Sequence, residues 1–222
     1  MIILMEWISP EYVEQLHKGG WNPYSQHLEK IGQEWHWIIS IFDDEAYEQI
    51  YPNIIEKNEV YIRHDDIKIK IIEKETVSIT TDELLETYYF QHMPRSIKIK
   101  FKTPTAFKQK GQYLFYPDLR CILQSMILKY DAVTVKEGTI QEEILEELVR
   151  NTRITQYNLR SCSFYMEGVK IPAFIGEIKL AISGPQTLVN YINFLFRFAC
   201  YSGIGIKASV GMGAIEIQEK SL

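Results

Sequence analysis

The sequence predicts an α+β fold built from two tandem ferredoxin-like (βαββαβ) domains, the first of which lacks its first strand. Three observations support this prediction. Helix and strand patterns follow a similar order in the two halves of the chain, Pro94 interrupts the chain between them, and the charge balance changes at the same place. Residues 1–95 contain 8 Lys and Arg against 18 Asp and Glu, whereas residues 96–222 contain 16 against 11. We therefore expect an N-terminal domain at residues 1–95 and a C-terminal domain at residues 96–222.

The composition of the 222-residue chain, 46% hydrophobic and 24% charged, is typical of a soluble globular protein and excludes disorder as its main state. No apolar stretch approaches the ~20 residues that a transmembrane helix needs. The opening Met1–Met5 lacks the basic flank and cleavage site of a signal peptide. We expect a cytoplasmic protein that does not bind membranes. Cys121, Cys162 and Cys200 show no C-x-x-C spacing, which predicts neither a disulfide framework nor a zinc site.

In the first half, the predicted order is helix, strand, helix, strand, strand. Ser9 and Pro10 are typical of a helix start, and Gly19–Gly20 indicates where that helix ends. Because only sixteen residues precede His17, no room is left for a strand before this helix. Strands are predicted at residues 35–42, 60–63 and 67–72, with a second helix opened by Asp43.

In the second half, the predicted order is strand, helix, strand, strand, helix, strand, which is that of a ferredoxin-like domain. Its first strand alternates strictly, so that Ile97, Ile99 and Phe101 share one face and three lysines share the other. An additional acidic helix is expected at residues 139–149. The six elements of the domain are predicted at residues 96–102, 117–130, 153–166, 174–182, 187–200 and 214–217.

A glycine-rich segment, residues 201–213, lies between the last helix and the last strand; we call it the glycine loop. Two G-x-G pairs stand on either side of five residues that include Lys207. Glycine allows positive φ and close backbone approach, so successive amides can point at one anion. Alternatively, the glycines only shape a turn and a bulge. A dinucleotide-binding loop would follow a strand and precede a helix, and no G-K-[ST] is present, so the phosphates of a larger polymer are the favoured ligand.

With this loop, the sequence resembles the CRISPR-associated endoribonucleases that process repeat RNA, the Cas6 family of the repeat-associated RNA-binding superfamily. Three further segments, residues 16–25, 101–108 and 174–177, are similar to segments of that family. The resemblance spans nearly the whole chain. It implies CRISPR repeat RNA as the partner, with other subunits of a CRISPR complex or a second copy of the chain as further partners, and no cofactor.

The resemblance also implies a reaction. Members of the family cut each repeat once without a metal ion: the ribose 2'-hydroxyl attacks the adjacent phosphate, leaving a 2',3'-cyclic phosphate and a 5'-hydroxyl. Histidine suits such proton transfer because its reference pKa lies near the operating pH. His17 matches the family's catalytic histidine and is expected to act as general base. An acid role is also open, because positive charge is favoured at a helix C-terminus, and a plain capping role is the alternative.

Further catalytic candidates lie near His17 in the sequence or follow from the resemblance. His27 lies in an expected loop at residues 24–27 and is a candidate second proton carrier. Asn22 stands about where many members have a lysine, and the short N-terminus leaves the family's tyrosine unmatched. The candidate replacements are Lys18 or Lys30 for the lysine, and Tyr12 or Tyr24 for the tyrosine.

The charge pattern and the resemblance together predict the residues that bind RNA. They comprise the glycine loop, the lysine face of the strand at 96–102, and two arginines of the strand that follows. Ordinary surface charge is the alternative for each lysine. A non-catalytic RNA-binding subunit of a CRISPR interference complex is the alternative function, and a small-ligand protein is a remote third. The expected RNA-binding residues are Gly203, Gly205, Lys207, Gly211, Gly213, Lys98, Lys100, Lys102, Arg153 and Arg160.

Overall fold

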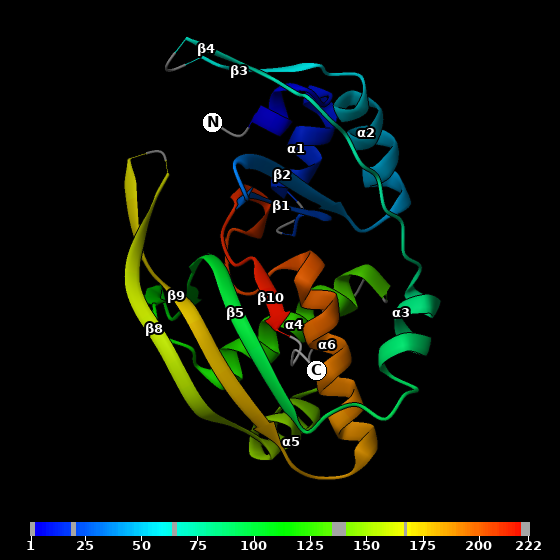
Figure 1. The fold of residues 1–222 in the computed structure, drawn as a ribbon, viewed down its shortest axis with the longest axis vertical. Helices are drawn as coiled ribbons and strands as arrows, with labels where there is room; N and C mark the ends of the chain where they lie inside the picture. Colours follow the sequence, from blue (N-terminus) through cyan, green and yellow to red (C-terminus); the bar gives the residue numbers. More distant parts are fainter. Residues whose placement is uncertain (1–2, 19–20, 64–65, 135–140, 167, 219–222) are drawn as a thin grey trace. The chain divides into compact units, whose positions relative to one another are not determined.

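The computed structural model describes residues 3–18, 21–63, 66–134, 141–166 and 168–218 (Figure 1). The chain forms two compact units, one made of residues 1–24 and 41–78 and the other of residues 25–40 and 79–222. Residues 25–40 and 79–95 thus group with the C-terminal half of the chain. The division into domains at residues 1–95 and 96–222 stays a prediction.

The second unit contains a four-stranded antiparallel sheet in the order β10-β5-β9-β8. Helices α4 and α6 connect β5 to β8 and β9 to β10, and α5 leads directly into β8 (Figure 1). This connectivity and strand order define a ferredoxin-like domain. The bounds are β5 Ser96–Thr105, α4 Leu119–Thr134, α5 Glu142–Asn151, β8 Thr152–Met166, β9 Val169–Ile182, α6 Gln186–Ser202 and β10 Ile215–Gln218.

The core of this unit lies between the sheet and helices α4 and α6. Ile97, Ile99 and Phe101 of β5 are buried, while the lysines between them face the other way, as the alternation predicts. Met126 of α4 and Phe196 of α6 are fully buried in the same cluster. Each such side chain contributes ~1.5–3 kcal/mol through removal from water. Helices α4 and α6 therefore cover one face of the sheet, and the face that carries the lysines is not covered by these helices.

The first unit is built around two helices and a hairpin. Ser9 caps α1 (Pro10–Lys18) by accepting a hydrogen bond from the Tyr12 amide (3.2 Å). Asp43 caps α2 (Asp44–Ile55) in the same way through the Ala46 amide (2.7 Å). Among the described residues no strand precedes α1, because Ile3–Glu6 forms a short 3-10 helix. The remaining strands of this unit, β3 (Glu59–Ile62) and β4 (Ile67–Lys70), pair antiparallel.

A second hairpin, β1 (Tyr24–Ile31) and β2 (Glu34–Ile41), joins the two helices of the first half. The order α1-β1-β2-α2-β3 is that of a βαββαβ unit without its first strand. In the described residues, β1 pairs with β2 and β3 pairs with β4 as two separate two-stranded sheets. The loop expected at residues 24–27 is wrong, because these residues begin β1. They are polar and yet buried, so hydrophobic alternation could not reveal the strand.

Other differences from the expected elements are local. Strand β9 begins at Val169 rather than residue 174, and pairs with β8 throughout its length. Helix α3 (Thr81–Tyr88) and the hairpin of β6 (Phe107–Gln109) and β7 (Gln112–Leu114) were not expected. The helix end at Gly19–Gly20 and the start of the acidic helix at 139–140 lie outside the described residues.

Candidate functional site

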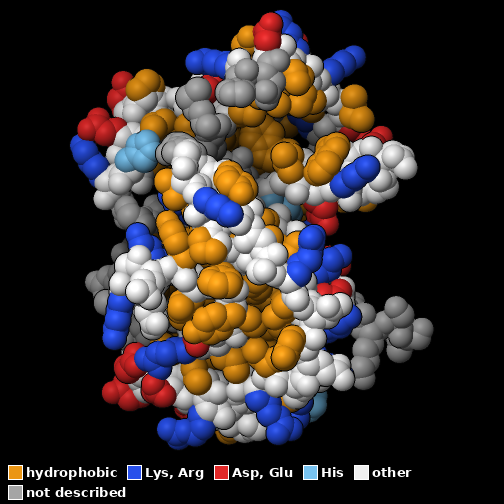
Figure 2. Space-filling view, turned by 90° about the vertical axis from the view of Figure 1, so that its left-hand side faces the viewer, with side chains coloured by type: hydrophobic (Ala, Val, Ile, Leu, Met, Phe, Trp, Pro, Cys, Tyr) orange, Lys and Arg blue, Asp and Glu red, His pale blue; other side chains and the backbone are white. Residues whose placement is uncertain are grey.

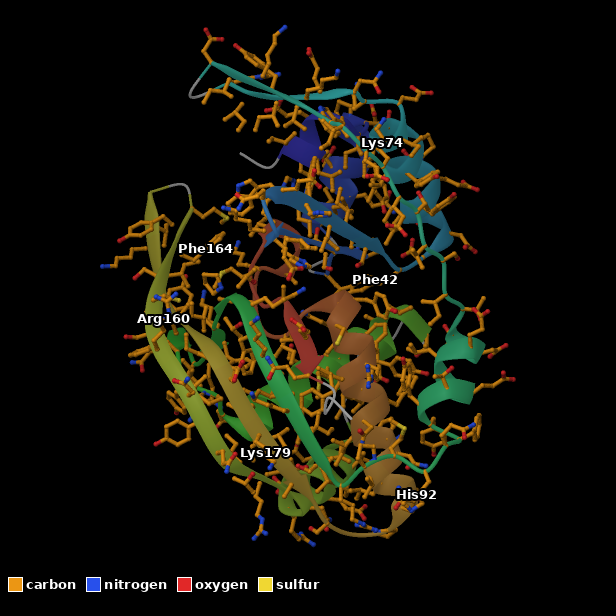
Figure 3. All side chains as sticks on the ribbon, in the orientation of Figure 1. Phe42, Lys74, His92, Arg160, Phe164 and Lys179 are labelled. Atoms are coloured by element: carbon orange, nitrogen blue, oxygen red, sulfur yellow. The ribbon has the colours of Figure 1, made fainter. Side chains whose placement is uncertain are left out.

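The face of the second unit's sheet that the helices leave open is strongly basic. Strand register places Lys98 opposite Lys179 and Lys100 opposite Glu177, and it places Arg160 opposite Ile175. Figure 3 labels Arg160 on β8 and Lys179 on β9. Alternation along the strands then assigns six cations to this side, which we call the basic face. Its cations are Lys98, Lys100, Lys102, Arg153, Arg160 and Lys179.

Two of these cations are already neutralised within the protein. Lys98 pairs with Glu177 (2.8 Å), and Lys102 pairs with Glu29 of β1 (2.6 Å). Within the described part of the chain, the other four make no ion pair. The four unpaired cations are Lys100, Arg153, Arg160 and Lys179. Lys179 is an additional cation that the alternation of residues 177–180 predicts for this face.

The Lys102–Glu29 pair also involves His27. The Glu29 carboxylate lies 3.8 Å from Nε2 of His27, and that nitrogen is buried with no hydrogen-bond partner among the described residues. Burial, followed by the charge of Lys102, lowers the pKa of His27 against the opposing effect of Glu29. Burial alone would raise the pKa of Glu29, but its hydrogen bond to Lys102 and the charge of Lys102 lower it. His27 is thus a buried imidazole, 8% exposed, whose neutral form the fold favours. Its role as a second proton carrier stays a prediction that this burial does not support.

The buried His27 predicts an acid-sensitive stability. The folded protein holds the His27 pKa below its ordinary 6.5, so the unfolded chain binds a proton first as the pH falls. Stability should therefore be lost as the pH falls below about 6.5 toward the lowered pKa. We expect the free energy of unfolding, measured by urea titration at pH 7.5 and 5.5, to fall less in His27→Gln than in the wild type. Equal losses would contradict the assignment.

The glycine loop begins in the last turn of α6 and packs at one end of the basic face. Met212 of the loop is buried with Ile171 and Ala173 of β9, which share a side of that strand with Lys179. The exposed Lys207, at φ 62°, precedes the short 3-10 helix Ala208–Val210. The Met212 contact thus places part of the loop against β9 on the side that carries the basic face.

The four glycine amides of the loop are used inside the protein. Gly203 donates to Ala199 O (2.8 Å), Gly205 to Ser125 Oγ (2.8 Å), Gly211 to Ala208 O (3.4 Å) and Gly213 to Pro104 O (3.0 Å). The expectation that these amides point at an anion is therefore wrong. The contact of Gly203, Gly205, Gly211 and Gly213 with RNA stays a prediction. Their hydrogen bonds support the alternative that they shape the loop.

Close backbone packing explains the glycine at two of these positions. A Cβ atom at Gly205 would lie 2.3 Å from Ala106 O, and one at Gly213 would lie 2.0 Å from Ile204 O. Both residues also have positive φ. A side chain at Gly205 would push the loop away from Ala106, and one at Gly213 would push apart two segments of the loop itself.

We expect Gly213→Ala to destabilise the protein by at least about 3 kcal/mol, because it combines a positive φ of 75° with a clash against backbone. Gly32→Ala is the matched control, since Gly32 has φ 62° and open space around a Cβ; about 1 kcal/mol is expected there. Thermal unfolding of the two variants measures the difference. Equal destabilisation of the two variants would show that the clash with Ile204 O adds nothing to the cost of the positive φ.

Strand β1 holds the loop from one side. Ser25 Oγ donates to Tyr201 O, and Gln26 Nε2 donates to Ser209 O (2.6 Å). Gln26 Oε1 in turn accepts from Trp37 Nε1 (2.9 Å). No motif in the sequence pointed to the two contacts of β1 with Tyr201 and Ser209, because they join residues more than 170 positions apart.

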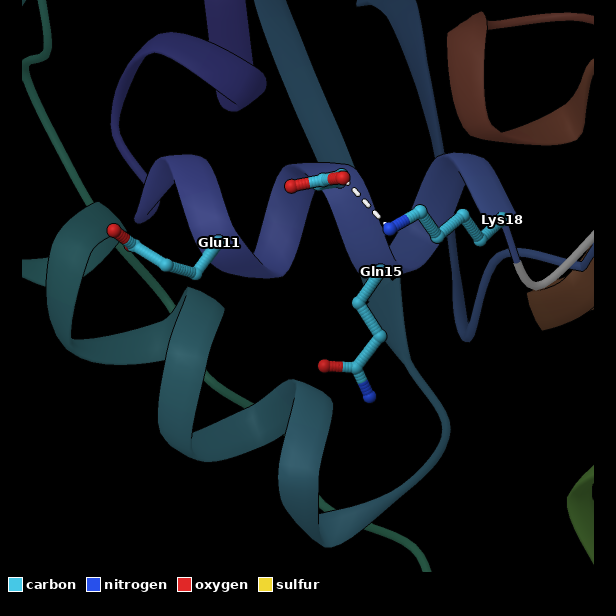
Figure 4. Close-up of a pocket in the computed structure, with 4 residues that line it drawn as sticks. Glu11, Gln15 and Lys18 are labelled. Atoms are coloured by element: carbon cyan, nitrogen blue, oxygen red, sulfur yellow. Dashed lines mark ion pairs between the residues drawn. The ribbon is translucent and has the colours of Figure 1, made fainter.

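The candidates of the first unit differ in exposure. His17 is exposed in the last turn of α1, and Lys18 pairs with Glu14 (2.7 Å). An open hollow of about 490 Å³ beside α1 is lined by Glu11, Glu14, Gln15 and Lys18 (Figure 4). Its two carboxylates against one lysine are unsuited to a polyanion.

Tyr24 is 1% exposed, and its hydroxyl donates to Met5 Sδ (3.9 Å). A buried phenol beside a thioether has no access to substrate in this conformation. Burial, with Asp43 and Glu45 nearby, raises the pKa of Tyr12 to about 12. The catalytic roles of Lys18, Tyr24 and Tyr12 stay predictions, and the placement of the two tyrosines does not support theirs.

Within the described ranges the protein has neither a metal-binding cluster nor a membrane-spanning helix. No group of three or more His, Cys, Asp and Glu side chains there lies close enough to hold a metal ion. None of the described helices is both long and apolar enough to span a membrane. On the face shown in Figure 2, Lys and Arg side chains lie around exposed hydrophobic side chains. Tyr157 (75% exposed) and Tyr165 on β8 are among the protein's exposed aromatic residues.

Solved structures of other proteins share the fold of this chain. A Cas6 product complex matches with a TM-score of 0.80 and 21% identity, covering 97% of this chain and 90% of that one. Thermus thermophilus Cas6 matches with a TM-score of 0.67 and 20% identity, covering 97% and 87%. The fold is therefore that of the Cas6 structures, with tandem ferredoxin-like folds.

Sequence comparison identifies the family. Residues 99–215 match the family described as CRISPR-associated endoribonuclease Cas6. A protein of that name from Streptococcus thermophilus is 31% identical over 217 residues, covering 98% of this chain and 89% of the relative. Another from Mycobacterium tuberculosis is 33% identical over 219 residues, covering 97% and 69%. The chain belongs to the CRISPR-associated endoribonuclease Cas6 family.

Proposed function

We propose that this protein is an endoribonuclease that cuts CRISPR precursor RNA within its repeats without a metal ion. The 2'-hydroxyl attacks the adjacent phosphate, and the products carry a 2',3'-cyclic phosphate and a 5'-hydroxyl. The observation that carries the proposal is the 31% identity to a CRISPR-associated endoribonuclease over 98% of the chain. The basic face supports it, because a polyanion needs a surface with unneutralised cations.

The described residues suggest how the substrate is held. Lys100, Arg153, Arg160 and Lys179 offer charges to successive phosphates, and the exposed Lys207 of the glycine loop offers a fifth charge. Such contacts position the strand without reading its sequence. Lys98 and Lys102 are expected to contribute less, because Glu177 and Glu29 already neutralise them. The exposed rings of Tyr157 and Tyr165 lie opposite Ile178 and Lys170, so they are on the other side of β8 from the basic face and are assigned no contact on this path.

The chemical step needs a base at the 2'-hydroxyl, a donor at the phosphate and an acid at the leaving 5' oxygen. His17 is the exposed histidine that matches the family's catalytic position, so we assign it the proton transfer at the 2'-hydroxyl. Lys18 is the nearest cation in the sequence, but it must leave Glu14 to act. Association with other subunits of a CRISPR complex, or with a second copy, stays a prediction.

The decisive experiment is incubation of the protein with repeat RNA in EDTA, followed by mapping of the product ends. A 5'-hydroxyl and a 2',3'-cyclic phosphate are expected, and a 2'-deoxy substitution at the scissile nucleotide should stop cutting while leaving binding unchanged. Cleavage that requires added metal, or that survives the 2'-deoxy substitution, would overturn the mechanism.

One observation favours a second function, that of a non-catalytic RNA-binding subunit of an interference complex. Three of the six catalytic candidates, Tyr12, Tyr24 and His27, are buried, whereas the unpaired cations of the basic face and Lys207 remain available. Under this alternative the protein binds repeat RNA and never cuts it. The same incubation separates the two functions.

A further inference from the structure

The C-terminal end of α6 is held by a lysine from another helix. Helix α6 ends at Ser202, and Gly203 follows with φ 68°. The last carbonyls of a helix lack donors within the helix. Lys129 of α4 supplies them: its Nζ donates to Ser202 O (3.0 Å) and to Gly203 O (2.9 Å).

A second side chain of α4 binds the same segment. Ser125 lies one turn before Lys129, on the same side of the helix, and its Oγ accepts from the Gly205 amide (2.8 Å). Three main-chain groups of residues 202–205 are therefore bound by two side chains of one rigid helix. These residues lead into Lys207, and the amide of the intervening Ile206 donates to Ala106 O (3.0 Å).

Lysine is an unusual residue at a buried position such as that of the Lys129 amine. Among the described residues no carboxylate pairs with Lys129, and burial lowers its pKa to about 7. A buried amine without an opposite charge costs stability. Capping does not require it, because Gly203 N already closes the helix by donating to Ala199 O (2.8 Å). A loss of stability such as that from burying the Lys129 amine is expected where a residue serves function rather than folding.

We propose that Lys129, assisted by Ser125, is a positioning residue that sets the conformation of the glycine loop so that Lys207 can contact RNA phosphate. The inference rests on the proposed RNA-binding function. Lys129 itself touches no RNA: it acts through the loop. The contribution of Lys207 to RNA affinity therefore depends on Lys129, whereas the contribution of the basic face does not.

A double-mutant cycle tests this dependence. Repeat RNA affinity is measured for the wild type, Lys207→Ala, Lys129→Met and the double variant. We expect each single change to weaken binding by about tenfold, the size of one charge-assisted contact, and the double variant to lose no more. Lys100→Ala on the basic face is the matched control, and it should weaken binding by the same factor whether or not Lys129→Met is also present.

A merely structural role gives a different result. Lys129→Met would then lower the melting temperature, but below that temperature Lys207→Ala would weaken binding by the same factor in either background. Ser125→Ala, a smaller change that removes the acceptor of the Gly205 amide, should show the same dependence if Lys129→Met fails to fold. Additive effects, or no effect of Lys207→Ala in a wild type that binds RNA, would overturn this inference alone. Absence of RNA binding by the wild type would overturn the proposed function, and this inference with it.

Discussion

Replacing His17 by alanine is expected to lower the rate of repeat RNA cleavage by about 10²–10⁴ and to leave RNA affinity unchanged. The exposed imidazole at the end of α1 carries no role in packing, so its loss should not disturb the fold. His17 does not belong to the basic face, so its replacement should not remove a phosphate contact. Single-turnover cleavage with saturating protein measures the chemical step, and a binding titration with 2'-deoxy RNA measures affinity.

The control for this variant is His92→Ala. His92 is also exposed (Figure 3), and its neighbour Met93 contacts Gln186 at the start of α6, whereas the glycine loop follows the end of that helix. Its cleavage rate should equal that of the wild type. Unchanged cleavage by His17→Ala would exclude His17 as the required base, and a parallel loss of affinity would make it a binding residue.

Hydrophobic patterning predicted most of the second unit because that unit obeys simple periodicity. In β5 the apolar residues Ile97, Ile99 and Phe101 alternate with lysines, and the same alternation assigned those lysines to an open face. The order of elements then followed the ferredoxin-like rule. What the pattern could not show is neutralisation: Glu29, which pairs with Lys102, is distant in the sequence.

The glycine loop and β1 were harder to predict, for a common reason. Gly205 and Gly213 are required by close contacts with carbonyl oxygens of Ala106 and Ile204. From the sequence, a glycine that accommodates a neighbour's oxygen cannot be told from one that exposes an amide. Gln26 and Ser25 are buried because the loop binds them, and polar residues buried through distant partners leave no periodic signal.

The affinity for repeat RNA is expected to fall by about 10³–10⁵ between about 50 and 200 mM salt, if roughly six to ten phosphates are neutralised. The basic face and the glycine loop supply five cations without ion pairs to described residues, and Lys98 and Lys102 can add to these on release of their carboxylates. Each neutralised phosphate releases counterions, so the logarithm of affinity should decline linearly with the logarithm of salt concentration.

Removing two cations of the basic face should reduce that slope by a defined amount. For Lys100→Ala combined with Lys179→Ala, the reduction should be about 1.4–1.8, since each contact contributes about 0.7–0.9. Lys68→Ala combined with Lys70→Ala removes the same charge from β4 of the first unit and is the control. If the net charge of the protein alone governs binding, the two pairs will change the slope equally. A change confined to Lys100 and Lys179 would locate the RNA backbone on the open face of the sheet, whereas a slope unaffected by their loss would place it elsewhere.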